Sequence, residues 1–267
     1  MIIRIGKNKR DYIDVLTDGH HWSYVTDISF TSEENASGLY SELTNKFQGH
    51  VIAIEASDSE QTLLENAGFR RAMNFFTCKD EYDDEDIFLP FGFLYENEYL
   101  PLPEQFPGKH LKQDKHINIR TQTTLEGIDP ADINSILEKS FRSPRDTDVT
   151  KKLFEQSEYV FFVKDEDKLI ACARSISNGS VAMILNVAVD PDYQGCGVGR
   201  RLIDGILDLI SEEKIVLNTH PGSVGFYNCD ARFRRNRNVF IYMKTDMPEA
   251  SRRRFVLPAG FNLRTQR

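Results

Sequence analysis

The residues best suited to chemistry form a glycine-rich loop in the C-terminal half of the chain. An apolar run over 185–189 leads into Asp-Pro-Asp-Tyr, and a loop with glycines at 195, 197 and 199 then opens a helical pattern. The first amides of a helix have no intrahelical partner, and the helix dipole adds positive potential there. Glycines let those amides approach a ligand closely. The loop is therefore predicted to hold an anion such as a pyrophosphate.

Two common nucleotide-binding loops do not have this spacing. A Walker loop needs Gly-Lys followed by Ser or Thr, whereas Gly199 is followed by Arg200 and Arg201. A Rossmann loop has the spacing G-x-G-x-x-G inside a βαβ unit. Here the spacing is G-x-G-x-G, and the preceding pattern is typical of antiparallel hairpins. Neither nucleotide-binding interpretation fits.

The segment Gln194-x-x-Gly197-x-Gly199 resembles the acetyl-CoA signature (Gln/Arg)-x-x-Gly-x-(Gly/Ala) of the GNAT family of N-acetyltransferases. The resemblance covers residues 117–244, including the order of elements. It implies that acetyl-CoA is the cosubstrate and that a primary amine attacks its thioester directly. The residues that the resemblance assigns to cofactor binding on the strand and loop are Asn186, Val187, Ala188, Val189, Gln194, Gly195, Cys196, Gly197, Val198, Gly199 and Arg200.

The same resemblance assigns two catalytic roles. The backbone amide of Val187 is expected to bind the thioester carbonyl and to stabilise the negative charge that develops there. Tyr227 matches the family tyrosine that protonates the departing CoA thiolate, with Ala231 standing where the family usually has Gly. Val187 and Tyr227 are therefore the catalytic candidates.

Further roles around the cofactor also come from the resemblance. His220 and Ser223 are expected to contact the cofactor. Many relatives place a carboxylate on the strand before the loop as general base, and this chain has Asn186 there. His220 is the alternative base, because the attacking amine must lose a proton.

An α/β pattern after residue 116 would position these residues. Asp129-Pro130 is typical of a helix start, and turns between three apolar runs predict antiparallel hairpins. The expected strands cover 117–124, 159–163, 169–175, 181–189, 215–219 and 239–244, and the expected helices begin at Pro130 or cover 147–156, 199–213 and 223–228. The predicted fold class is α/β, and the resemblance implies the GNAT acyl-CoA N-acyltransferase fold, a central, mostly antiparallel mixed sheet flanked by helices.

The first part of the chain repeats some of this pattern. Residues 51–79 and 214–244 each contain an apolar strand, a short helix, Phe-Arg-Arg and an apolar strand that ends in Lys. Leu64 stands in place of the tyrosine, and a capping box at Thr31-x-x-Glu34, without a glycine loop, precedes the earlier helix. The expected domains are a smaller α/β, degenerate GNAT-like half with connector (1–115), an acetyltransferase domain (116–247) and a basic tail (248–267).

Composition excludes several classes of protein. The 267 residues carry a net charge of −8, and residues 1–116 hold 11 basic and 21 acidic side chains, which argues against nucleic acid and favours a cationic acceptor. The mean hydropathy of −0.44 and the lack of an apolar run of about 18 residues argue against a membrane partner. The N-terminus has no signal-peptide core, and the four cysteines have no zinc-ligand spacing. A cytoplasmic protein without metal is expected.

Several alternatives stay open. The acceptor is a small-molecule or a peptide amine, and nothing in the sequence selects one. The donor is acetyl-CoA or a longer acyl-CoA. A non-catalytic acyl-CoA-binding module would keep the loop and have no turnover, and a homodimer is a further open alternative.

Overall fold

The computed structural model describes residues 1–6, 8–72, 75–78, 92–95, 98–101, 117–141, 145–220, 223–228, 230, 232–236 and 239–243. The chain forms two compact units, and each is described by itself. The first unit contains residues 1–104 and 218–267, and the second contains residues 105–217. The domain limits expected at residues 115 and 247 stay predictions, and the acidic run 80–86 and the tail 248–267 lie outside the described residues.

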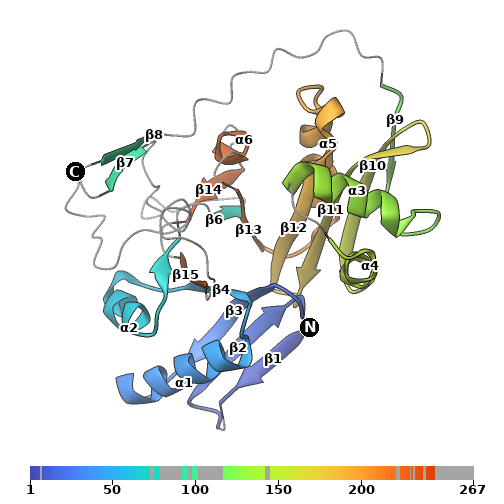
Figure 1. The fold of residues 1–267 in the computed structure, drawn as a ribbon. Coiled ribbons are helices and arrows are strands. Elements are labelled where there is room, and N and C mark those ends of the chain that lie inside the picture. The colour runs from blue at the N-terminus through green and yellow to red at the C-terminus, as the bar shows by residue number, and fades with distance from the viewer. Residues whose placement is uncertain are drawn as a thin grey trace. The chain divides into compact units, whose positions relative to one another are not determined.

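The second unit is built on a mixed sheet whose strands lie in the order β13-β12-β11-β10-β9 (Figure 1). The strands are β9 (Ile119–Gln122), β10 (Tyr159–Asp165), β11 (Lys168–Ser177), β12 (Val181–Val189) and β13 (Lys214–Asn218). Neighbours from β9 to β12 are antiparallel, and β13 is parallel to β12. The predicted hairpins are therefore confirmed. Strands β11 and β12 are long apolar runs because helices cover the sheet on both faces.

Helices α3 (Pro130–Phe141) and α4 (Thr147–Glu155) cover one face of this sheet, and α5 (Val198–Leu209) covers the other. Phe162 of β10 packs in one cluster with residues of α3 and α4. The neighbouring Phe161 lies against Gly205 of α5. Because successive strand residues point to opposite faces, the two sets of helices must lie on opposite sides. The helices that the sequence predicts in this unit are confirmed, with ends shifted by a few residues.

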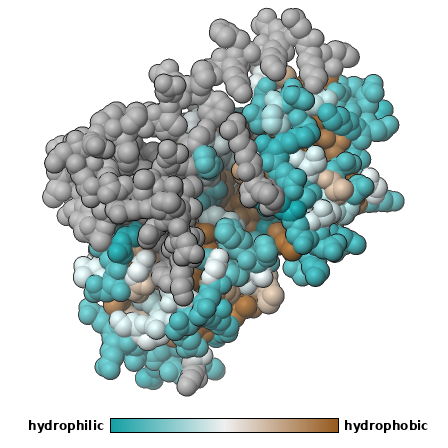
Figure 2. Space-filling view, viewed as in Figure 1, coloured by the Kyte–Doolittle hydropathy of each residue, from teal (hydrophilic) through white to brown (hydrophobic). Residues whose placement is uncertain are grey.

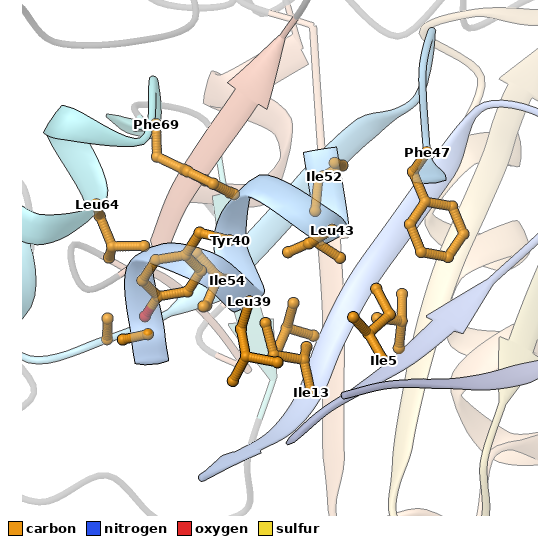
Figure 3. Packing of buried hydrophobic residues seen from close by; sticks show 14 residues of the cluster. Ile5, Ile13, Leu39, Tyr40, Leu43, Phe47, Ile52, Ile54, Leu64 and Phe69 are labelled. Carbon is orange, nitrogen blue, oxygen red and sulfur yellow. The ribbon is translucent and has the colours of Figure 1, made fainter. Parts of the chain in front are cut away.

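The first unit has its own mixed sheet, in the order β1-β2-β3-β4-β15-β5. Its strands are β1 (Ile2–Ile5), β2 (Tyr12–Thr17), β3 (Trp22–Ser29), β4 (Val51–Glu55), β5 (Arg70–Arg71) and β15 (Val239–Met243), and its helices are α1 (Glu33–Lys46) and α2 (Gln61–Asn66). Apolar residues of the sheet and of both helices form its core, with Tyr40 of α1 beside Phe69 (Figure 3).

The capping box predicted at Thr31 is wrong by one residue. Ser32 is the N-cap of α1, and its hydroxyl accepts the amide of Asn35. Thr31 instead donates both its amide and its hydroxyl to Asp11 Oδ1, each at 2.8 Å. The pattern predicted a helix start correctly, but a carboxylate from a distant turn competes for Thr31.

Two corresponding segments have exchanged their last strands. Both segments contain a strand, a helix and two further strands in the same order: β4-α2-β5-β6 in the first and β13-α6-β14-β15 in the second. Strand β6 is Phe75–Cys78, helix α6 is Val224–Asn228 and strand β14 is Phe233–Arg235. Strand β15 inserts between β4 and β5 and pairs antiparallel with both. Strand β6 in turn pairs antiparallel with β14, which the sequence analysis missed.

Strands β7 (Gly92–Tyr95) and β8 (Glu98–Pro101) form a separate hairpin.

The described surface in Figure 2 is largely hydrophilic, with apolar residues in small separate groups. Large apolar side chains that are exposed include Met1, Ile2, Ile119 and Phe141. Among the helices of the described ranges, none combines the length and the hydropathy needed to cross a membrane.

Candidate functional site

Strand β12 has an open edge in the half that leads to the glycine loop. It pairs with β13 only over Val181–Ile184, whereas its pairing with β11 continues to Val189. Among the described residues, the backbone of 186–189 therefore has no strand partner on the β13 side. An extended ligand can pair with such an edge through its own amides, as an added strand does. This half of β12 contains Asn186, Val187, Ala188 and Val189, to which the resemblance assigns cofactor binding.

A β-bulge bends β12 at the start of this open edge. The register with β11 shifts between Cys172 and Arg174, and Asn186 has a φ of 53°, which asparagine adopts more readily than most residues. The Nε of Arg174, a residue that is only 1% exposed, donates to Asn186 Oδ1 at 2.5 Å. Asn186 is therefore held by an arginine, and the bulge takes the backbone around Val187 out of regular pairing with β11.

The turn after β12 is fixed by side-chain hydrogen bonds. Gln194 Nε2 donates to the carbonyl of Val189 at 3.1 Å, which ties the loop to the end of the strand. Asp190 accepts the amide of Asp192 at 3.0 Å and pairs with Lys139 Nζ at 3.2 Å. Burial would raise the pKa of the Asp190 carboxyl, but these two contacts hold that pKa below its usual value. A 3₁₀ turn, Pro191–Tyr193, follows from this arrangement.

The glycine loop leads into α5 and leaves the N-terminus of this helix without a side-chain cap. Gly195 and Gly197 have φ values of 79° and 81°, which L-residues rarely adopt. Gly197 is the N-cap of α5 and has no side chain to accept the first helical amides. A Cβ at Gly197 would meet nothing within 4 Å. The loop therefore leaves both room and unpaired donors for an anion.

The helix starts of the two units differ in charge as well as in capping. Helix α1 begins with Glu33 and Glu34 after its serine cap, so its first amides face negative charge. Helix α5 begins with the buried Val198, then Gly199 and the exposed Arg200. The positive potential of a helix N-terminus suits an anion at α5 and is offset at α1.

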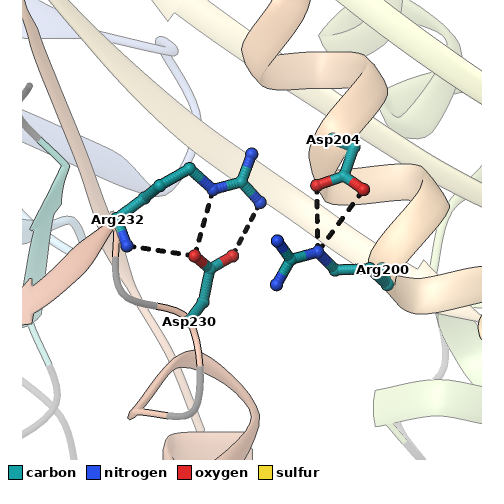
Figure 4. A network of polar contacts seen from close by, with 4 residues as sticks. All are labelled: Arg200, Asp204, Asp230 and Arg232. Atoms are coloured by element: carbon teal, nitrogen blue, oxygen red, sulfur yellow. Dashed lines mark hydrogen bonds and ion pairs between the residues drawn. The ribbon is translucent and has the colours of Figure 1, made fainter.

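Two predicted loop residues are held by local contacts. Arg200 Nε pairs with Asp204 Oδ1 at 3.0 Å, one helical turn further along α5 (Figure 4). The half-buried Cys196 thiol lies 3.9 Å from the carbonyl of Gln194. Both residues lie in the predicted loop and first turn.

Three predicted site residues, His220, Ser223 and Tyr227, lie in the other compact unit. The amide of Ser223 donates to the carbonyl of His220 at 2.8 Å, and α6 carries Tyr227 one turn later. Tyr227 is 4% exposed, between the rings of Phe226 and Phe233. Burial raises the pKa of its phenol above the ordinary value.

The end of α6 is fixed by a nearby ion pair. The guanidinium of Arg232 donates from Nε and Nη2 to the two carboxylate oxygens of the buried Asp230, at 3.0 and 2.7 Å (Figure 4). The amide of Asp230 donates to the carbonyl of Tyr227 at 3.0 Å. The pair therefore supports the backbone that carries Tyr227.

Sequence reasoning missed two arginines near β12. Arg174 interrupts the apolar run 169–176 of β11, so a charged residue within a buried strand was an available signal. Arg145 lies between α3 and α4, where no periodicity marks it. Only the three-dimensional structure shows its position.

Residues 131–230 match the family described as Acetyltransferase (GNAT) family. The chain is also similar to GCN5-related N-acetyltransferase 1, chloroplastic, from Arabidopsis thaliana, with 27% identity over 110 residues, 39% of this chain and 56% of the relative. The match thus spans about half the length of that plant relative.

One solved structure shares the fold over the whole chain. A GCN5-related N-acetyltransferase from Kribbella flavida is 9% identical and has a TM-score of 0.52, covering 100% of this chain and 93% of its own. A GNAT family N-acetyltransferase from Escherichia coli in complex with CoA is 22% identical over 36% of this chain and 58% of its own, with a TM-score of 0.32. The likeness to the Kribbella flavida structure shows that the mixed sheets flanked by helices have the GNAT acyltransferase fold.

Proposed function

We propose that this chain moves an acetyl group from acetyl-CoA to a primary amine, because residues 131–230 match the GNAT acetyltransferase family, whose members transfer an acyl group from acyl-CoA. The observation that carries the proposal is the junction of β12 and α5. An open strand edge, a bulge and an uncapped helix start follow one another within one compact unit. In the proposal, the edge pairs with the pantetheine arm and the loop amides hold the pyrophosphate.

The backbone amide of Val187 stabilises the charge that develops on the thioester oxygen. Val187 follows the bulge residue Asn186, where pairing with β13 has already ended. A donor fixed by the fold needs no reorganisation when the charge appears, which is why such donors contribute strongly to catalysis.

Tyr227 supplies the proton to the departing thiolate. The phenol carries its proton at neutral pH, as a general acid must, and burial raises its pKa further. Asn186 cannot serve as base because an amide does not titrate, and its oxygen already accepts from Arg174. His220, which is exposed, or a water relay takes the proton of the attacking amine.

The first test is calorimetric titration of the full chain with acetyl-CoA and with longer acyl-CoA thioesters. We expect one-to-one binding of acetyl-CoA that weakens by at least about tenfold in Gly197→Val, because a side chain at positive φ strains the loop and crowds its amides. Gly179→Val is the matched control, since Gly179 also has positive φ and open space but lies in the turn at the other end of β12.

Two results would contradict the donor assignment. If Gly197→Val binds acetyl-CoA as tightly as Gly179→Val does, the loop is not the binding site. If no CoA thioester binds, the chain is not an acyl-CoA enzyme. Tighter binding of a longer thioester would replace acetyl-CoA as the donor.

The second test separates an enzyme from a binding module. Tyr227→Phe should lower kcat by about 10²- to 10⁴-fold while acetyl-CoA binding persists, because only the proton donor is lost. Tyr40→Phe is the control: Tyr40 is also buried, and its hydroxyl has no hydrogen-bond partner among the described residues. CoA release is followed with a thiol reagent. An unchanged kcat in Tyr227→Phe would remove Tyr227 from the mechanism.

A further inference from the structure

Arg145 is a half-buried cation for which the described residues supply no acceptor. Its Nε is buried and has no hydrogen-bond partner in the part of the chain that the structure describes. Its Cζ lies 5.0 Å from the centre of the Phe141 ring, and among the described residues no carboxylate forms an ion pair with it. Guanidinium groups taken out of water are normally paired. The structure therefore shows a charge that a ligand can satisfy.

The backbone of Arg145 is clamped, so its side chain starts from a fixed point. The amide of Arg145 donates to Glu138 Oε1 at 2.9 Å, and its carbonyl accepts Asn134 Nδ2 at 3.1 Å. Asn134 is itself fixed by Thr150, whose hydroxyl donates to Asn134 Oδ1 at 2.8 Å. Asn134 and Thr150 are both buried. Glu138 thus fixes the main chain of Arg145, and no carboxylate of the described ranges forms an ion pair with its guanidinium.

This cation lies beside the open half of β12. Helix α3 packs against β11 and β12, and Ser140 Oγ, next to Phe141, donates to the carbonyl of Val189 at 3.1 Å. Cys172 of β11 lies 3.9 Å from the carbonyl of Asn186. Burial raises the pKa of the Cys172 thiol to about 12, and the positive charge of Arg145 opposes this rise. Arg145 is therefore close to the bulge.

We propose that Arg145 binds an anionic oxygen group, a carboxylate or a phosphate, on the amine acceptor, with the exposed ring of Phe141 as an apolar wall beside it. A guanidinium matches the paired oxygens of either group. The proposal rests on the proposed function, because it names the acceptor class of the same site. The acidic first part of the chain favoured a cationic acceptor, whereas Arg145 favours an amine that also carries a negative group.

The test uses pairs of amines that differ only in the anionic group. Free amino acids are compared with their carboxamides, and O-phosphoethanolamine with ethanolamine, in the full chain with acetyl-CoA. The wild type should prefer the anionic member of at least one pair by about tenfold to hundredfold in kcat/KM. Arg145→Gln should abolish this preference through KM, and Arg145→Lys should keep part of it. The pair that shows the effect distinguishes carboxylate from phosphate.

Arg120→Gln is the matched control, because Arg120 is an exposed arginine of β9 in the same unit. It should leave the preference unchanged. Calorimetric titration of the same amines in the presence of CoA gives a readout without turnover, and the dissociation constant of the preferred anionic amine should rise by about tenfold in Arg145→Gln. The proposal would be overturned if the wild type had equal kcat/KM for the anionic and neutral amines of both pairs. An unchanged preference in Arg145→Gln would overturn it as well. Failure of acetyl-CoA to bind would instead contradict the proposed function.

Discussion

Gly205 permits α5 to pack directly on the ring of Phe161, and replacing it tests this packing. A Cβ added at Gly205 would lie 2.0 Å from Cζ of Phe161 and 2.3 and 2.4 Å from the two Cε atoms. Non-bonded carbon atoms prefer about 3.5–4.0 Å. The ring, which is 6% exposed, or the helix must therefore move by about 1.5 Å. Forcing extra carbon into a packed core costs about 1–3 kcal/mol, and this overlap places Gly205→Ala at the upper end.

Gly38→Ala is the matched substitution. Gly38 lies within α1, and a Cβ there would meet nothing within 4 Å. Alanine is favoured over glycine by about 1 kcal/mol in a helix, and both variants receive this gain. We therefore expect Gly38→Ala to raise the free energy of unfolding and Gly205→Ala to lower it, with a difference of about 2–3 kcal/mol between the two.

Urea denaturation followed by circular dichroism measures both variants, and hydrogen exchange of the α5 amides locates the effect. In a Phe161→Leu background, Gly205→Ala should cost less, because the overlapping ring atoms are gone. If Gly205→Ala is as stable as Gly38→Ala, helix α5 does not rest on Phe161, and the placement of the loop at its N-terminus loses its support.

Further expectations concern stability. Asp11 has a pKa lowered from 3.8 to about 2, chiefly because its carboxylate accepts the amide of Thr31. This stabilisation is complete above pH of about 4 and is lost as the pH falls through about 2. The gap in urea midpoint between wild type and Asp11→Asn should therefore shrink from pH 5 to pH 2.5, and a constant gap would refute the role of charge. Thr150→Val removes the donor to the buried Asn134 Oδ1 and should cost about 1–3 kcal/mol in urea unfolding, with Thr150→Ser costing less. Equal losses in the two variants would show that the hydroxyl is unimportant.

Local patterns in the sequence predicted most of the second unit. Gly197 and the apolar stripe of α5 mark one helix start. Asp129 before Pro130 marks the start of α3, and the Oδ1 of Asp129 accepts the amide of Ala131 at 2.8 Å. The turn at Asn178 and Gly179 marks a hairpin. These signals were sufficient because capping and turn preferences act within a few residues.

The features that the sequence analysis missed depend on distant residues. Strand β14 has only three residues, two of them arginines, and becomes a strand because β6 lies beside it. The bulge at Asn186 results from how β12 pairs with β11, which periodicity does not encode. Arg145 was not identified as a site residue because its neighbours come from α3 and its relation to β12 arises only on folding.

The exchange of β6 and β15 has a consequence for the order in which the protein folds as it is synthesised. Strand β4 pairs with β15, and Asn236 Nδ2 donates to Glu55 Oε1 across 181 residues. Closing so long a loop slows folding. During synthesis on the ribosome, β4 and β5 lack the strand β15 that pairs between them until almost the whole chain has emerged. Neither copy of the repeated segment can therefore be completed before the other, so the two copies must fold together.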